Sequence, residues 1–223
     1  MAIYNGRLSQ IDQSEVKRYA GIRKGGEQEF PESYVKEACM EVQLAAVPKG
    51  IYQWYDYDAA CHTVLSNPPL TLEGTSIQKH LEKSTRVCVL GVTIGEGVEQ
   101  RSSQLFKEGN YTVGMLVDSA ATTAVEQVAD QVNALVNKEA HKLGYQTTWR
   151  FSPGYGNWPI EVQKDLAAII HTDEIGLSVT ETSMLFPRKS VTAIIGLMPE
   201  NGAIGTKRGC SSCGKLDCPS RNN

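Results

Sequence analysis

A continuous apolar run limits the folds that this chain can adopt. The segment 86–93 reads Arg-Val-Cys-Val-Leu-Gly-Val-Thr, and glycine is its only interruption. Successive side chains of a strand point to opposite sides of the sheet, so apolar residues at consecutive positions indicate burial on both faces. This is the strand that the sequence predicts most clearly.

Apolar residues at spacings of three and four predict the helices that pack on such a strand. The longest begins at Tyr111 or at Ser119 and ends at Leu143, before Gly144. Asp12 is a candidate N-cap for a short helix near the N-terminus. The other expected helices cover residues 12–20, 31–45, 76–82, 97–106 and 160–171.

Further segments rich in β-branched and aromatic residues complete the expected sheet. They are 51–57 with 61–65 as its partner, 145–151, and the pair 177–182 and 190–197, joined across residues 187–189. Together these segments predict an α+β fold: a single domain, residues 1–200, with helices packed on a central, mainly antiparallel, twisted sheet. A Cys-rich C-terminal tail, residues 201–223, would follow it.

Charge and hydropathy exclude two classes of function. The 223 residues carry a formal net charge of -3, whereas a general nucleic-acid-binding protein needs a basic face. No apolar run approaches the ~20 residues that span a bilayer, and no signal peptide opens the chain. We therefore expect a cytoplasmic protein with no nucleic-acid and no membrane partner.

The segment 150–159, Arg-Phe-Ser-Pro-Gly-Tyr-Gly-Asn-Trp-Pro, is the strongest candidate for a binding loop. Proline and glycine break the preceding strand and allow a turn. Arg150 supplies a cation that can hold a carboxylate by two hydrogen bonds. Tyr155 and Trp158 are expected on the rim, with flat faces for a planar ligand. The alternative interpretation is a tight turn with Arg150 in a surface ion pair.

The pattern Arg150-x-x-x-Gly154-Tyr155, followed closely by Pro159, is similar to the S-adenosylmethionine-binding loop in the activation domain of cobalamin-dependent methionine synthase. The following segment 175–191 resembles the corresponding stretch of that family. Residues 11–19 and 105–111 resemble its free-standing, single-domain members. The resemblance covers residues 8–200, and its densest part is 150–191.

The resemblance implies roles for several residues. Arg150 would grip the carboxylate of S-adenosylmethionine, Gly154 would expose backbone groups to the ligand, and Tyr155 would lie between nucleoside and corrin. A tyrosine pair of the family falls here on Ala203 and Ile204, so any contact there would be through the backbone.

The family also places a glutamate of its cofactor site on the long helix. Glu126 is the nearest candidate, and an alternative register puts Ala134 there. Asp130 lies one turn from Glu126 and projects with it, a pair that also suits a solvated face. The residues at 156–157, Gly-Asn, replace the proline that the family has directly after the tyrosine. An acidic residue of the family's N-terminal segment has no identified counterpart.

The tail contains Cys210, Cys213 and Cys218, with a proline after the last. In a reducing compartment, such crowding favours metal ligation over disulfides. Three thiolates suit an iron–sulfur cluster whose fourth ligand comes from Cys61, a partner or a small molecule, and zinc is the less favoured metal. A metal-free thiol tail and a redox dithiol stay open as alternatives.

The function that the resemblance implies is reductive reactivation of a corrinoid methyltransferase. The protein would be the activation subunit of a cobalamin-dependent methionine synthase: it would bind S-adenosylmethionine and cap the cobalamin of a corrinoid-binding partner. Co(II) would then be reduced, with an electron from a donor such as flavodoxin or ferredoxin, and methylated. The alternative is an iron–sulfur electron-transfer or docking module without S-adenosylmethionine chemistry. A stand-alone methyltransferase is disfavoured because no glycine fingerprint follows a strand.

Overall fold

The computed structural model describes residues 1–22 and 31–200, and its centre is an antiparallel sheet. The long strands are β2 (Lys49–Asp58), β5 (Arg86–Thr93) and β9 (Ser190–Pro199). The sheet order is β4-β3-β2-β5-β9-β6, and β1 also pairs with β2. The short strands are β1 (Ala2–Asn5), β3 (Thr63–Val64), β4 (Leu70–Thr71) and β6 (Tyr145–Thr147).

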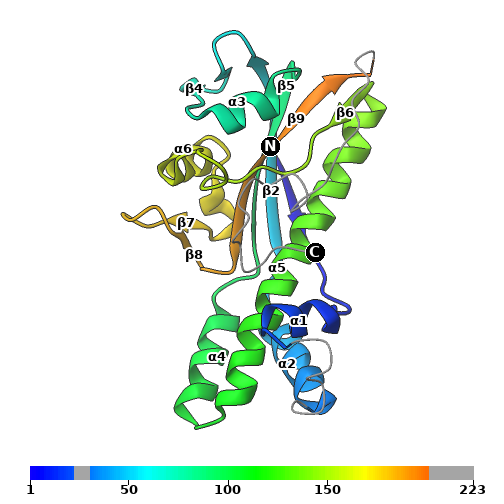
Figure 1. Cartoon of the computed structure of the whole chain (residues 1–223), viewed down its shortest axis with the longest axis vertical. Helices are drawn as coiled ribbons and strands as arrows, with labels where there is room; N and C mark the ends of the chain where they lie inside the picture. Colours follow the sequence, from blue (N-terminus) through cyan, green and yellow to red (C-terminus); the bar gives the residue numbers. More distant parts are fainter. Residues whose placement is uncertain (23–30, 201–223) are drawn as a thin grey trace.

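Helices cover both faces of this sheet (Figure 1). The long helix α5 runs along one face, with α1, α2 and α4 gathered towards one of its ends, while α3 and α6 lie over the opposite face. Their bounds are α1 (Gln13–Tyr19), α2 (Glu32–Ala45), α3 (Thr75–Leu81), α4 (Gly97–Lys107), α5 (Tyr111–Lys142) and α6 (Gln163–Ile169). The turns η1 (Ile160–Val162) and η2 (Thr172–Ile175) flank α6. The α+β fold predicted from the sequence is confirmed.

Strand β5 separates two hydrophobic cores. Cys88, Leu90 and Val92 belong to the core beneath α5, whereas Val87 and Val89 belong to the core beneath α3 and α6. The predicted burial of this strand on both faces is therefore confirmed. Its neighbours β2 and β9 pair with it along its whole length, which fixes the register of all three strands.

Helix α5 begins at Tyr111, the earlier of the two predicted first residues. Small residues such as Ala120 and Ala124 on its buried face let it lie close to the sheet. Gly144, with φ +76°, follows its C-terminus, where a left-handed residue ends many helices. Within residues 1–22 and 31–200, no helix is both long and apolar enough to cross a membrane.

Two predicted strands are wrong in extent. The strand expected over 145–151 ends at Thr147, and Phe151 returns to the sheet through one isolated bridge to Ile194. The strands expected over 177–182 and 190–197 are also not joined directly across residues 187–189. β7 (Ser178–Val179) pairs with β8 (Leu185–Phe186) in a separate two-stranded ribbon ahead of β9. Strands of two residues are too short to show a period in the sequence. The expected division at residue 201 lies outside the described residues.

The two-core arrangement predicts a large effect of shortening a side chain in β5. Leu90→Ala should lower the free energy of unfolding by about 2–5 kcal/mol, because a buried leucine leaves a cavity that the sheet cannot close. Leu44→Ala is the matched control, since Leu44 is 86% exposed on α2. Urea unfolding measures both. Equal losses in the two variants would contradict the assignment of β5 to the core.

Candidate functional site

The loop that follows β6 is held by hydrogen bonds within its own backbone. The Tyr155 amide donates to the Ser152 carbonyl at 3.2 Å, and the Trp158 amide donates to the Tyr155 carbonyl at 3.0 Å. Gly154 has φ +86°, a conformation that favours glycine, and its amide donates to the Trp158 carbonyl at 2.9 Å. Because that amide is used internally, the carbonyl of Gly154 is the backbone group that it can offer to a ligand.

Of the two aromatic residues expected on the rim of the loop, one is exposed and the other is buried. Tyr155 is 53% exposed at the tip of the loop. Trp158 is only 1% exposed and belongs to the core beneath α3 and α6, so the prediction of a rim position for Trp158 is wrong. A loop has no regular period that tells buried from exposed rings, and the large apolar surface of the indole decided its place.

Arg150 leaves the root of the loop and reaches helix α5. Its Nη2 donates to the Glu126 carboxylate at 3.1 Å and lies 3.0 Å from a carboxylate oxygen of Asp130. The structure thus brings Arg150 to Glu126 and Asp130, which precede it in the sequence by 24 and 20 residues. Burial raises the pKa of the Glu126 carboxyl, and the positive charge of Arg150 opposes that shift.

The guanidinium of Arg150 is enclosed in this arrangement. Its Nη1 is buried and has no hydrogen-bond partner among the residues that the structure describes. A ligand carboxylate therefore needs Arg150 to turn outward or Asp130 to move aside. The Asp130 side chain is 76% exposed, and solvent-exposed ion pairs contribute about 0–1 kcal/mol, so a ligand can replace Asp130 at small cost.

Helix α1 adds residues to this region that the sequence did not single out. The Arg18 guanidinium lies 4.1 Å from the centre of the Tyr19 ring, and two of its nitrogens donate to Glu15 at 2.9 and 2.6 Å. Burial raises the pKa of Tyr19, and the charge of Glu126 adds to this. Arg18 and Tyr19 thus lie near Glu126. The spacing of Glu15 and Arg18 indicated a helical ion pair, but nothing in the sequence placed that pair beside α5.

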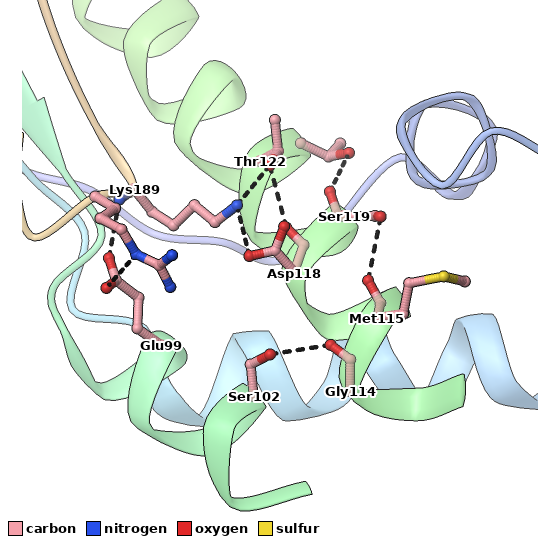
Figure 2. Close-up of polar contacts among 10 residues, drawn as sticks. Glu99, Ser102, Gly114, Met115, Asp118, Ser119, Thr122 and Lys189 are labelled. Carbon is pink, nitrogen blue, oxygen red and sulfur yellow. Dashed lines mark hydrogen bonds and ion pairs between the residues drawn. The ribbon is translucent and has the colours of Figure 1, made fainter. Parts of the chain in front are cut away.

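A second polar network lies elsewhere, where α4 and α5 meet the start of β9 (Figure 2). The ammonium group of Lys189 lies 2.9 Å from Asp118 and donates to Thr122 at 2.9 Å, as Figure 2 shows. Glu99 accepts from the Lys189 amide at 3.1 Å and from Arg188 at 3.0 Å. Because these charged groups already have partners, we interpret the network as structural: its ion pairs and hydrogen bonds hold the helices against the sheet.

The remaining predicted site residues lie outside the described residues. These are Ala203, Ile204, Cys210, Cys213 and Cys218, and their proposed roles stay predictions. Cys61, the possible fourth ligand, is an exposed free thiol in the turn between β2 and β3. Residues 1–22 and 31–200 contain no group of three histidine, cysteine or acidic side chains arranged to hold a metal.

A partly buried histidine supports the loop from below. His80 of α3 shares a hydrogen bond of 2.9 Å between Nε2 and the Trp149 carbonyl, and its ring centre lies 4.3 Å from that of Trp149 and 4.9 Å from that of Phe151. Burial lowers the pKa of His80 to about 4, against the effect of the bond to Trp149. His80 is therefore neutral at physiological pH.

This pKa predicts a stability loss in mild acid. Between about pH 6.5 and 4 the unfolded chain binds a proton at His80 that the folded chain does not, so the free energy of unfolding falls as the pH drops through this window. The loss from this group should be on the order of 3 kcal/mol. Urea unfolding of wild type and His80→Gln across the window measures it. If the free energies of unfolding of the two proteins fall by the same amount as the pH drops, the conclusion that His80 is neutral and buried is wrong.

Known proteins give a match in structure alone. No protein-family model and no curated protein matches the sequence. The chain is similar to the crystal structure of the MetH reactivation domain bound to AdoHcy, with 14% sequence identity and a TM-score of 0.60. The match covers 92% of this chain and 81% of that one. The protein therefore has the fold of the MetH reactivation domain, as the resemblance of its loop segment implied.

Proposed function

We propose that this protein is an activation subunit that binds S-adenosylmethionine in the region of Arg150, Glu126 and Tyr155 and reactivates a corrinoid methyltransferase. The observation that carries the proposal is the charge of this region. One guanidinium lies between two carboxylates, those of Glu126 and Asp130, and the neighbouring Arg18 is paired with Glu15, so these side chains together carry a net negative charge. The solved MetH reactivation domain, which has the same fold, is bound to AdoHcy.

S-adenosylmethionine has the complementary charge pattern. It carries one carboxylate, one ammonium group and one sulfonium group, and so a net positive charge. In our proposal, its carboxylate displaces Asp130 from Arg150, and its ammonium group meets the acidic pair on α5. Complementary charge favours this ligand over anionic ones. Transfer of the methyl group removes the sulfonium charge, so the product, S-adenosylhomocysteine, should fit the region less well.

Tyr155 is the residue that we place between nucleoside and corrin. It stands at the exposed tip of the loop, and its ring meets the ring of Phe151 edge-on, with centres 6.0 Å apart. Phe151 is itself buried in the core beneath α3 and α6. An aromatic ring supported from beneath can present its outer face to a planar ligand without losing much side-chain freedom. We propose that Ala203 and Ile204 add backbone contacts.

The chemistry belongs to the ligand and to the cobalamin that the partner carries. Reduction of Co(II) takes one electron from an external donor, for which flavodoxin or ferredoxin are the candidates. The methyl group then passes from S-adenosylmethionine to the reduced cobalt, and the electron pair of the broken C–S bond stays on sulfur. The part of this protein is to hold the methyl donor in line with the metal and to exclude water.

The carboxylate contact can be tested directly. Arg150→Ala should weaken S-adenosylmethionine binding by about 2–5 kcal/mol, because a charge-assisted contact to a largely buried guanidinium is lost. Arg150→Lys should lose nearly as much, since an ammonium group cannot reproduce the fork. Isothermal titration calorimetry measures both.

Arg188→Ala is the matched control for these variants, because Arg188 forms its ion pair with Glu99 outside the loop. Thermal unfolding identifies any variant that has lost its fold. Wild-type affinity in a folded Arg150→Ala variant would remove the carboxylate assignment. Absence of binding by the wild type would favour the electron-transfer or docking alternative.

The Cys-rich tail is proposed to bind an iron–sulfur cluster that delivers the electron. Protein purified without oxygen should then show broad visible absorption and a paramagnetic signal on reduction or oxidation. Replacing Cys210, Cys213 and Cys218 with serine should remove the iron and leave S-adenosylmethionine affinity unchanged. Stoichiometric zinc in a colourless protein would contradict electron delivery by the tail. It would still agree with the three cysteines as metal ligands.

A further inference from the structure

Helix α3 contacts the binding loop at two separate points. At its N-terminal end, the side chain of Asn157 accepts from the Ser76 amide at 2.9 Å and donates to the Thr75 hydroxyl at 2.9 Å. The Asn157 amide donates in return to the Ser76 hydroxyl at 3.3 Å. Gly74, at the N-cap of α3, has no side chain to satisfy the first turn. Asn157 therefore caps a helix that begins 82 residues earlier in the chain.

Glycines on both sides allow this close approach. A β-carbon on Gly74 would lie 2.7 Å from the Asn157 carbonyl oxygen, and one on Gly156 would collide with the Ser76 side chain. Both glycines have positive φ, +104° and +57°, so a side chain would strain the backbone as well. The contact is thus specified by the helix and by the loop together.

The second contact lies near the C-terminal end of α3. The His80 ring bonds to the Trp149 carbonyl and packs against Phe151, as described above. The stretch between Trp149 and Asn157 contains Arg150, Gly154 and Tyr155, the loop residues assigned to the ligand. A helix of seven residues holds both ends of this stretch, and such a helix is about 10 Å long.

We propose that α3 is a two-point clamp, and that Asn157 and His80 are positioning residues that set the shape of the binding loop. A glycine-containing loop loses much conformational freedom when it is ordered, so a loop ordered in advance binds more tightly. Gly156 occupies the position where the resembling family has a proline, and glycine does not restrain the backbone. Asn157, the next residue, supplies the restraint through α3. The consequence for the ligand rests on the proposed function, whereas the consequence for the loop does not.

The clamp is tested first without any ligand, by hydrogen exchange. Asn157→Ala should speed exchange of the amides of Gly154, Tyr155 and Trp158 by about tenfold, because the loop opens more often. Asn157→Asp should keep most of the protection, since its carboxylate still accepts from the Ser76 amide at a helix N-terminus. Asn110→Ala is the matched control: Asn110 is the N-cap of α5 and makes no side-chain cap bond.

The second measurement is S-adenosylmethionine affinity of the same proteins by calorimetry. Asn157→Ala should raise the dissociation constant about tenfold, and His80→Phe, which keeps a ring but loses the bond to Trp149, should also raise it. Asn157→Asp should stay within about threefold of the wild type, which a general loss of folding would not produce.

Two results would contradict the proposal. Unchanged exchange of the loop amides in Asn157→Ala would overturn the clamp itself. Faster loop exchange with wild-type affinity would overturn its role in ligand binding, since α3 would then order the loop without serving the ligand. Absence of binding in the wild type, with faster loop exchange in Asn157→Ala, would instead remove the proposed function and leave the clamp as a property of the fold.

Discussion

Burial of β5 on both faces is the constraint on which the rest of the structure depends. Its side chains alternate between two cores, so helices must cover the sheet on both sides. Helix α5 covers one side, and the chain must then pass the edge of the sheet to place α6 on the other. The segment that makes this crossing follows the edge strand β6 and contains the binding loop, residues 150–159.

The crossing explains why the loop carries several kinds of chemistry in ten residues. Its first part still faces α5, where Arg150 reaches Glu126 and Asp130. Its last part enters the opposite core through Trp158, and Asn157 joins α3. Tyr155 stands between these two anchored ends, at the surface. A loop fixed at both ends can hold a charged ligand end and an aromatic ligand face in one fixed relation, which is what positioning a methyl donor requires.

Regular elements were predictable because their patterns are local. The apolar run of β5 and the helical spacing of α5 show in the sequence, and Glu126 and Asp130 were correctly expected to project together. The sequence showed the loop as an interruption of a strand next to an arginine. It did not show the burial of Trp158, since a loop has no regular spacing of buried and exposed residues. Nor did it show the cap that Asn157 provides to α3, because it joins residues 82 apart. A hydrogen bond between residues so far apart in the sequence forms only when the whole fold brings them together.

We propose that the loop of residues 150–159 and α5 together form a site for S-adenosylmethionine. A crystal structure of the protein with this ligand tests it most directly. We expect the ligand carboxylate on the Arg150 guanidinium in place of Asp130, the ammonium group beside Glu126, and the nucleoside against Tyr155. Ligand bound elsewhere, with Arg150 still held by both Glu126 and Asp130, would contradict it.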